Sequence, residues 1–451
     1  MYSPQQYDKV IHMKESTFVG GAAAAINSDI RQPYTQSWSV GIQRELGAGR
    51  AIEVRYNGNI TRNQWLAMDV NEVNIFENGF LNEFKMAQSN LKLNQAAGVS
   101  SFANRGLPGQ ATLPIMTAAG ISFTNSTFIN QLTNGQAGSF ANTLATNRDY
   151  FCRMVGSSFQ PCGTSYGAGA GYPINFWLAN PFALGSWTNA SYMSDTGYSN
   201  YHGLQVEYRQ RPWHGASVTA NYTLSKTMGV ATAGDWTGSY SQFTVRDLKS
   251  SYAPMGTDRR HVVHVNAIYE LPFGQGRKWL ADNAVLDKIV GGWTVSTIVT
   301  IQSGTPFRIS GNNNTFNNKR DGGLILNGIT QQAIQDQVGL YFNAAGQPYF
   351  LPPDWVAQVK ADGTIGAHNV PGTWGQIFYL HGPYQTFCDI GVSKAIPIRG
   401  QVRFKFQVEM LNAFNNPTFA QSTTALNSTG FGRGTQTATS RRIELRGNIE
   451  F

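Results

Sequence analysis

The chain has 451 residues, of which 13% are charged, 12% are aromatic and 48 are glycine. Scarce charge and abundant glycine disfavour a helical bundle, which needs periodic stretches rich in Lys, Glu and Leu, and they suit many strands joined by polar loops. The formal net charge is +8, but the basic residues are scattered and form no stripe with interleaved aromatics, which argues against a nucleic-acid partner.

Segments in which apolar and polar residues alternate recur along the chain. Successive side chains of a strand point to opposite faces, so these segments predict strands with one apolar and one polar face. The longer ones run about 9 to 12 residues, the length that a tilted strand needs to cross a bilayer, whereas soluble strands average nearer five or six. In chain order, the predicted strands cover residues 38–43, 52–60, 204–209, 217–224, 263–271, 293–302, 387–398, 402–410 and 442–451.

The last two predicted strands alternate most clearly, with residues such as Phe404 and Leu445 on one face and charged residues on the other. A soluble sandwich also alternates, but the strand length favours a membrane barrel, whose lumen faces water. We interpret the polar face as a solvated, mutually paired wall rather than a specific ligand site. The side chains predicted to face the lumen are Arg403, Lys405, Glu409, Arg442, Glu444 and Arg446.

The connections between strands are either tight turns or long loops. Tight turns are expected at residues 46–50, 212–215 and 399–400, and long loops at about 61–199, 226–259 and 304–383. Outer-membrane barrels have short periplasmic turns and longer extracellular loops. Short helices are expected within the connections, at residues 82–98, around 279–290 and at 327–342. The sequence therefore predicts an all-β fold, a transmembrane antiparallel β-barrel that comprises the C-terminal strands of a large barrel, with long extracellular loops.

Three cysteines are present, at Cys152, Cys162 and Cys388. The first two lie ten positions apart in a Gly/Ser-rich stretch and form either a disulfide, in an oxidising compartment, or two unrelated thiols. The spacing does not decide between these. Cys388 falls within a predicted strand, where a small packing role is expected.

No group of residues in the sequence predicts catalysis, a cofactor or a metal ion. His261 and His264 are three positions apart in a strand, so they point to opposite faces and do not chelate one metal. The string Gly274-Gln275-Gly276 lacks the third glycine of a dinucleotide-binding fingerprint and is interpreted as a turn. The motifs CxxC and HExxH do not occur. We therefore expect a protein that is not an enzyme.

Neither a membrane-spanning helix nor a signal peptide is found in the sequence. No run reaches the roughly 18 apolar residues that a membrane helix requires. The first residues, MYSPQQYDKVIHMKE, lack a basic segment followed by an apolar one. Taken alone, this start predicts a cytoplasmic protein, in conflict with the predicted barrel.

Several strings, in order, resemble the C-terminal barrel portion of TonB-dependent outer-membrane receptors, particularly the Oar-like group with a carboxypeptidase-regulatory-like N-terminal domain. The strings are PYTQSWSVGIQREL (33–46), YNGN (56–59), SNYHGLQVEYRQR (199–211), ANYTLSK (220–226), TDRRHVVHVNAIYELPFGQGRKW (257–279), GGWTVSTIVTIQSGTPF (291–307) and EMLNAFNNPTF (409–419), with a final strand that ends in Phe451. They touch about a third of the chain, and their order makes the resemblance fairly specific.

The resemblance implies a receptor whose barrel of about 22 strands is closed by an N-terminal plug. Such receptors take up a scarce nutrient with energy delivered by TonB, and here the ligand would be a small molecule, a peptide or an oligosaccharide. The terminal Phe451 resembles the signal by which the barrel-assembly machinery recognises its clients. The expected location is the bacterial outer membrane, in contact with its lipid.

The sequence departs from the family pattern in that only nine or ten strands are placed and no signal peptide, TonB box or plug is found. Residues 1–34 are therefore expected to be a loop or a truncated upstream barrel segment, residues 35–451 the barrel region, and the chain a fragment of a longer reading frame. Two alternatives remain at this point: a passive, porin-like barrel and a soluble, secreted β-rich binding module.

The terminal aromatic residue gives a first testable prediction. Replacing Phe451 with a charged residue in the full-length protein should reduce its assembly into the outer membrane, because the assembly signal would be lost. Surface level and heat-modifiable electrophoretic mobility measure the effect. Unchanged values would rule out this role for Phe451.

Overall fold

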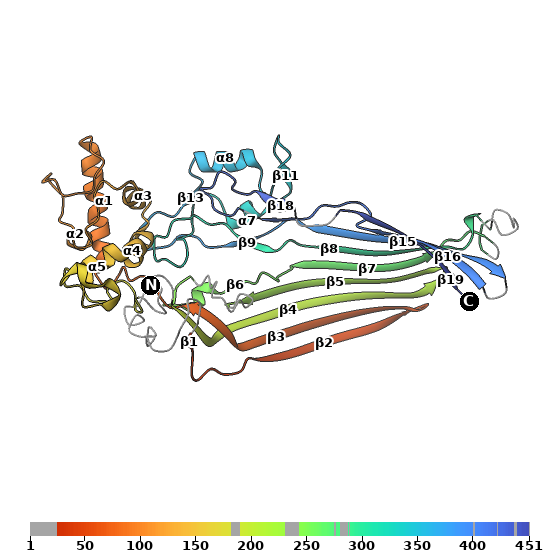
Figure 1. The fold of residues 1–451 in the computed structure, drawn as a ribbon. Coiled ribbons are helices and arrows are strands. Elements are labelled where there is room, and N and C mark those ends of the chain that lie inside the picture. Colours follow the sequence, from red (N-terminus) through yellow and green to blue (C-terminus); the bar gives the residue numbers. More distant parts are fainter. Residues whose placement is uncertain are drawn as a thin grey trace.

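Nine long strands, each antiparallel to the next along the chain, form one sheet in the computed structural model (Figure 1). Across the sheet they follow the order β2 (Tyr34–Gly47), β3 (Arg50–Asp69), β4 (Ser191–Trp213), β5 (Ala216–Gly229), β7 (His261–Glu270), β8 (Trp293–Gln302), β15 (Gln385–Arg399), β16 (Val402–Leu411) and β19 (Arg442–Glu450), while the short β1 (Ala25–Ile26) and β6 (Ala253–Pro254) pair with β4 and β5. Each of the nine strands lies beside its neighbour in sequence, so the sheet is a meander.

The structure describes residues 25–181, 190–230, 243–274, 277–279, 287, 289–399, 402–421, 423–436 and 440–450. Phe451 lies outside these residues, as do residues 1–24 and most of the helical stretch expected around 279–290.

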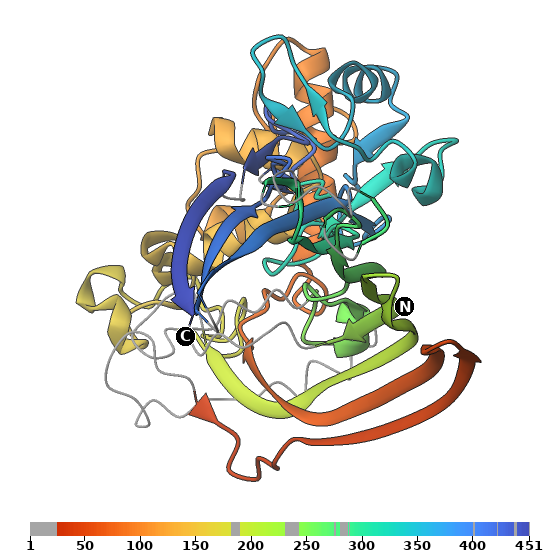
Figure 2. The same ribbon diagram turned by 90° about the vertical axis from the view of Figure 1, so that its right-hand side faces the viewer.

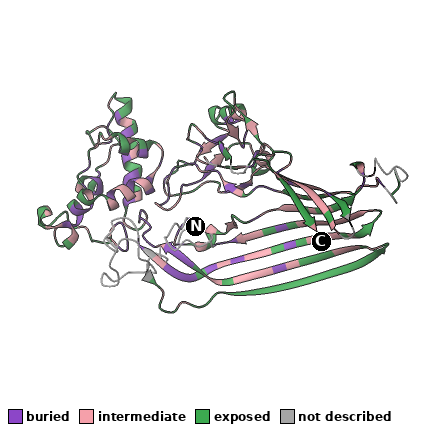
Figure 3. Cartoon of the chain, turned by 45° about the vertical axis from the view of Figure 1, so that its right-hand side comes forward, coloured by how far each residue is buried: buried purple, intermediate pink, exposed green. Residues whose placement is uncertain are grey.

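All nine predicted strands are confirmed, and some extend well beyond their predicted ends. β3 has 20 residues and β4 has 23, so the loop predicted at 61–199 spans only 70–190. The alternation fails in these extensions because both faces of the strands are covered there. Leu66 and Met68, for example, are buried in a small core with Val230, and Figure 3 shows burial increasing toward this end of the strands.

Two of the predicted tight turns are two-residue hairpins with left-handed backbone at both central positions. Ala48 and Gly49 have φ of 50° and 70°, and His214 and Gly215 have φ of 49° and 83°. Turns of this hand match the right-handed twist of the flanking strands, which is why short hairpins use them. The turn predicted at 399–400 includes residues outside those that the structure describes.

Viewed along the strands, the sheet bends into an open arc (Figure 2). β2 and β19 form its two edges, and no pairing between described residues joins them. Every residue of β2 is exposed. None of the described helices has the length and apolar character needed to cross a membrane.

The loop between β3 and β4 folds into a helical lobe (residues 70–181) rather than a chain with short decorations, which corrects the prediction for this region. Its helices are α1 (Phe80–Ala96), α2 (Pro114–Ala118), α3 (Ser126–Thr133), α4 (Ala137–Thr146) and α5 (Arg148–Val155). They pack around Phe140, whose ring centroid lies 4.5 Å from that of Phe128 and 5.7 Å from those of Phe80 and Phe84. This core makes the lobe a folded unit.

A buried carboxylate and a disulfide connect segments of the helical lobe. The buried carboxylate of Glu83 accepts hydrogen bonds from the backbone N–H groups of Ile115 (2.9 Å) and Met116 (2.8 Å) at the start of α2. A disulfide joins Cys152 in α5 to Cys162, the pairing that the sequence left open, and both cysteines are buried. Cys388 is buried in β15, within reach of the Thr297 hydroxyl at 3.7 Å.

The segments after β8 and β16 form a second lobe, which we call the β-rich lobe (residues 304–383 and 417–436). It contains β9 (Pro306–Arg308), β10 (Leu324–Leu326), α7 (Gln331–Gln335), β11 (Tyr341–Phe342), β12 (Pro348–Tyr349), α8 (Pro353–Ala361), β13 (Ile365–Ala367), β14 (Tyr379–His381), β17 (Phe419–Gln421) and β18 (Gly434–Gln436). The helix predicted at 327–342 shrinks to the five residues of α7. Both lobes lie toward the end of the sheet opposite the tight turns (Figure 1).

The disulfide should stabilise the helical lobe locally. Closing a ten-residue loop is worth about 2–3 kcal/mol, so the double variant Cys152→Ala/Cys162→Ala should open around α5 more readily by about that amount. Hydrogen exchange of residues 147–172 measures the change, and Cys388→Ala is the matched control. Equal exchange in the double variant and the wild type would contradict the prediction.

Candidate functional site

The polar face of the sheet is its concave face. Two hollows of about 440 and 460 Å³ open on this side, and most of their lining residues belong to the polar rows of the strands. The first is lined by residues of β3, β4, β5 and β7, the second by residues of β7, β8, β15 and β16. We call this surface the inner wall.

Carboxylates face each other across neighbouring strands of the inner wall. Glu53 of β3 lies directly opposite Glu207 of β4. Like charges in this position repel, but each carboxylate contacts an arginine two residues further along its own strand, Arg55 and Arg209 respectively. Opposed carboxylates therefore stay in the wall because each one has a cation beside it.

The lumen-facing residues predicted from sequence repeat this arrangement on β16 and β19. Glu409 lies opposite Glu444, and Nη2 of Arg446 lies 3.1 Å from Glu409 and 2.9 Å from Glu444. The remaining pairs are Arg442 with Glu444 at 2.8 Å, Arg403 with Glu450 at 2.6 Å and Lys405 with Glu450 at 3.9 Å. All six residues are thus ion-paired, in two clusters: Glu409, Arg442, Glu444 and Arg446 form one, and Arg403 and Lys405 form the other with Glu450.

An apolar patch interrupts the polar inner wall. Ile268 and Ile298, on neighbouring strands, are 51% and 55% exposed. Both line the 460 Å³ hollow, beside Gly391, and Leu411 is also exposed at its edge. Ile298 lies in the row of β8 that otherwise holds the polar residues Thr294, Ser296, Thr300 and Gln302. Isoleucines exposed on the concave side mark a surface suited to packing rather than to water.

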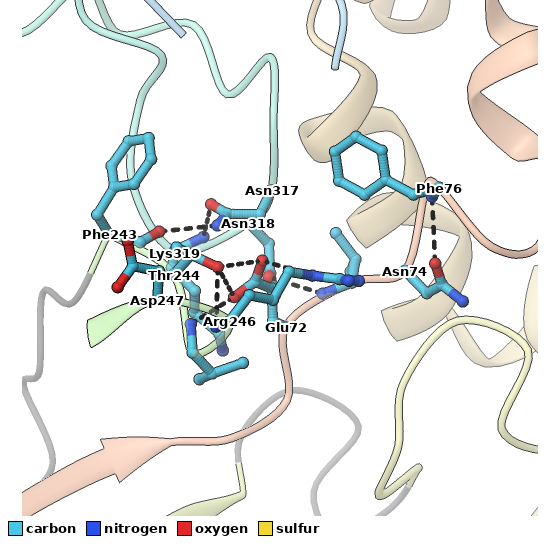
Figure 4. Close-up of polar contacts among 12 residues, drawn as sticks. Glu72, Asn74, Phe76, Phe243, Thr244, Arg246, Asp247, Asn317, Asn318 and Lys319 are labelled. Carbon is cyan, nitrogen blue, oxygen red and sulfur yellow. Dashed lines mark hydrogen bonds and ion pairs between the residues drawn. The ribbon is translucent and has the colours of Figure 1, made fainter. Parts of the chain in front are cut away.

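Three connections that are far apart in sequence meet at one cluster of charges, the loop clasp, which consists of Asp69, Glu72, Glu77, Arg246 and Lys319. Its most deeply buried members are Glu72, Arg246 and Lys319, which Figure 4 labels. Nε of Arg246 lies 3.3 Å from Glu72, and its Nη1 lies 2.9 Å from Glu77. Nζ of Lys319 lies 2.6 Å from Asp69. The clasp therefore ties together the end of β3, the segment before β6 and the β-rich lobe.

Burial sets the electrostatics of the clasp. It raises the pKa of Glu72, against the hydrogen bonds that this carboxylate accepts. It lowers the pKa of Lys319, against the attraction of Asp69. It also lowers the pKa of Arg246 to about 9, which leaves the guanidinium charged at neutral pH. Removing one member would leave its partner charged and buried, which is strongly unfavourable.

Backbone groups and amides extend the clasp. Glu72 accepts hydrogen bonds from the Thr244 hydroxyl at 2.8 Å and the Val245 N–H at 2.7 Å. The amide of Asn317 donates to the Phe243 carbonyl at 2.8 Å, and that of Asn318 donates to Asn142 of the helical lobe at 3.0 Å. The two lobes are thereby fixed to each other as well as to the sheet.

A third hollow, of about 510 Å³, lies between the segment around β6 and the β-rich lobe. Five of its twelve described lining residues are aromatic, one is a cation and none is a carboxylate. Those that define it are Phe243, Tyr252, Trp374, Phe378, Tyr379 and Arg320. We call it the seam hollow. Its aromatic rings and single arginine suit contact with a ring-bearing ligand.

The residues considered for catalysis are not brought together. His261 contacts the Tyr222 hydroxyl at 2.9 Å on one face of the sheet, and His264 contacts the Thr300 hydroxyl at 2.9 Å on the other. Among the residues that the structure describes, no three His, Cys, Asp or Glu side chains gather closely enough to bind a metal ion.

Sequence reasoning missed the loop clasp and most of the helical lobe, of which only α1, expected at residues 82–98, is confirmed. The members of the clasp lie in three distant segments without a shared spacing, so only the fold reveals them. The helices of the lobe had a local signal, since Asn125 and Asn147 accept hydrogen bonds from the first turns of α3 and α5, and Asn is a preferred N-cap residue.

The clasp gives a prediction about the loops. Glu72→Gln should make opening of the connected loops easier by about 3 kcal/mol, because Arg246 would lose a buried partner. Hydrogen exchange of residues 243–247 and 313–319 measures this. The matched control is Glu270→Gln, which breaks an exposed ion pair with Arg277 and should have little effect. Similar exchange in both variants would show that the clasp does not fix the loops.

The chain was compared with protein families, with curated proteins and with solved structures. The sequence profile of the family described as an outer membrane beta barrel domain matches residues 3–444. No curated protein matches the chain. Among solved structures, the outer membrane transporter YddB from Escherichia coli is similar over 95% of this chain and 34% of its own, with 9% identity and a TM-score of 0.38. The pyoverdine outer membrane receptor FpvA from Pseudomonas aeruginosa PAO1 is similar over 94% and 30%, with 10% identity and a TM-score of 0.33.

The chain spans about a third of the length of these two solved chains. The family profile, by contrast, covers nearly all of it. The long alternating strands, the paired inner wall and this match agree, and the chain belongs to the outer membrane β-barrel domain family of the bacterial outer membrane.

Proposed function

We propose that the chain supplies the barrel wall and the ligand-facing loops of a TonB-dependent receptor of the Oar-like group, which takes up or adheres to a ligand without covalent chemistry. The strings that resemble this group, from residues 33–46 to 409–419, support the assignment. The partners would be TonB, a plug domain and the barrel-assembly machinery, and the ligand a small molecule, a peptide or an oligosaccharide.

The apolar patch of the inner wall is the observation that carries the proposal. In an open pore, Ile268 and Ile298 would face water across the lumen, where exposed apolar surface is unfavourable. A lumen-filling segment would cover them, with the charged rows of the wall around the contact. The patch therefore favours a plugged receptor over the passive, porin-like alternative.

The loops support a ligand-binding role. The loop clasp fixes their positions relative to one another, and preorganised loops lose less conformational entropy on binding. The seam hollow offers aromatic surface and one arginine at the extracellular end. A soluble binding module, the other alternative, does not agree with membership of an outer-membrane barrel family.

Conductance tests the plug. The full-length protein in planar bilayers should show almost no steady conductance, and urea, which unfolds a plug before a barrel, should open it. A passive pore would conduct without urea, and such a result would reject the receptor proposal.

A matched pair of variants tests the patch. Ile298→Asp should raise the frequency of open events by disturbing the contact with the plug, whereas Thr300→Asp, two residues further along the same face, should not. Equal effects of the two substitutions would show that the patch has no special role.

A further inference from the structure

The convex face of the sheet, opposite the inner wall, is apolar along most of its width and carries charges of one sign. In the register of the strands it presents the alternate residues that begin with Tyr34 on β2. The row of residues that includes Tyr34 and its partner Arg62 lies near the loop end of the sheet. Between this row and the tight turns, the described strands place no Asp or Glu on the convex face. Its cations stand near the two ends of the strands, where headgroups border the hydrocarbon of a membrane.

At the loop end, aromatic side chains and histidines gather on this face. The Trp38 indole lies across Gly58, where any Cβ would come within 2.5 Å of it, and its ring centroid is 6.3 Å from that of His202. Tyr56 stacks on His202, and its hydroxyl lies 2.7 Å from Nδ1 of the imidazole. The absence of a side chain at Gly58 is what permits this packing.

The same arrangement recurs two strands away. Tyr222 stacks on His261, with its hydroxyl 2.9 Å from Nδ1, and the ring of Tyr384 lies 6.4 Å from His261. When a tyrosine hydroxyl donates to Nδ1, the neutral imidazole carries its hydrogen on Nε2, where it remains a donor. Both histidines are thus held by a tyrosine within a belt of aromatic rings.

Two permanently charged residues flank the histidines. Lys226 of β5 lies directly opposite His202 and is exposed. Arg62, at the loop end of β3, is exposed and lies over the ring of Tyr198, 5.4 Å from its centroid. We call Arg62, His202, Lys226 and His261 the basic band. Because the described strands place no carboxylate on this face between the Tyr34 row and the tight turns, the band offers positive charge at headgroup depth.

We propose that the basic band binds the phosphate groups of a phosphorylated lipid of the outer leaflet. Phosphate accepts charge-assisted hydrogen bonds from guanidinium, ammonium and imidazole groups, and acyl chains would lie along the apolar rows below the band. The aromatic rings beside the band suit the boundary between hydrocarbon and headgroups. This interaction depends on membership of the barrel family and not on the proposed transport activity.

The experiment uses the full-length protein in detergent and two probes, lipid A with its phosphates and the same lipid after enzymatic removal of phosphate. Native mass spectrometry measures the retained lipid. Arg62→Gln/Lys226→Gln should weaken retention of phosphorylated lipid A by roughly thirtyfold, since each basic residue close to an anionic lipid surface contributes about fivefold. The dephosphorylated lipid should bind the wild type about as weakly as the phosphorylated lipid binds this variant.

Two further variants separate the band from general effects of charge. Arg44→Gln/Arg50→Gln removes the same charge from exposed positions on the same face at the turn end and should retain phosphorylated lipid A as the wild type does. Arg62→Lys/Lys226→Arg keeps the charge and should restore retention. Unaltered heat-modifiable mobility shows that each variant is folded. Equal retention of both lipids, or equal losses at both ends of the strands, would overturn the proposal.

Discussion

The pairing of backbone groups is the constraint on which the rest of this structure depends. Inside hydrocarbon, an N–H or C=O without a partner costs several kcal/mol, so strands survive there only in continuous ladders. The meander from β2 to β19 provides such ladders at every step between neighbours. The two edges, β2 and β19, are the exception in the described sheet.

The register of the hydrogen-bonded strands then determines on which face of the sheet the charged side chains lie. Because side chains alternate, one register fixes an apolar convex face and a polar concave face over the whole sheet. Because charges are concentrated on the concave face, like charges lie opposite each other on neighbouring strands, as Glu53 does with Glu207 and Glu409 with Glu444. Arginines beside them resolve the repulsion. The ion pairs of the wall are a consequence of the register, and their contribution to the free energy of unfolding is small for the exposed pairs.

The same physics explains which parts of the molecule were visible in the sequence. A period of two is local, so all nine long strands were predicted correctly, and the polar residues of β16 and β19 share one face of the sheet, as their alternation indicated. The extensions of β3 and β4 were missed because Leu66 and Met68 meet a second layer, where the period disappears. The clasp and the seam hollow were missed because Glu72, Arg246 and Lys319 become neighbours only through the fold. The disulfide lies between these cases, since the spacing of Cys152 and Cys162 suggested it without deciding it.

Long loops normally have much conformational freedom, but the long loops of this chain are folded and packed against one another. Each lobe has its own apolar core, and the two approach so closely that a Cβ at Gly138 would meet the Asn317 carbonyl oxygen at 2.2 Å. Buried charges then connect both lobes to the strand ends. Displacing one loop would expose the charges of another, so the loops are expected to open together or not at all. A ligand bound at the seam hollow would therefore meet one preformed surface, and its contacts with one lobe would be transmitted through the clasp to the other.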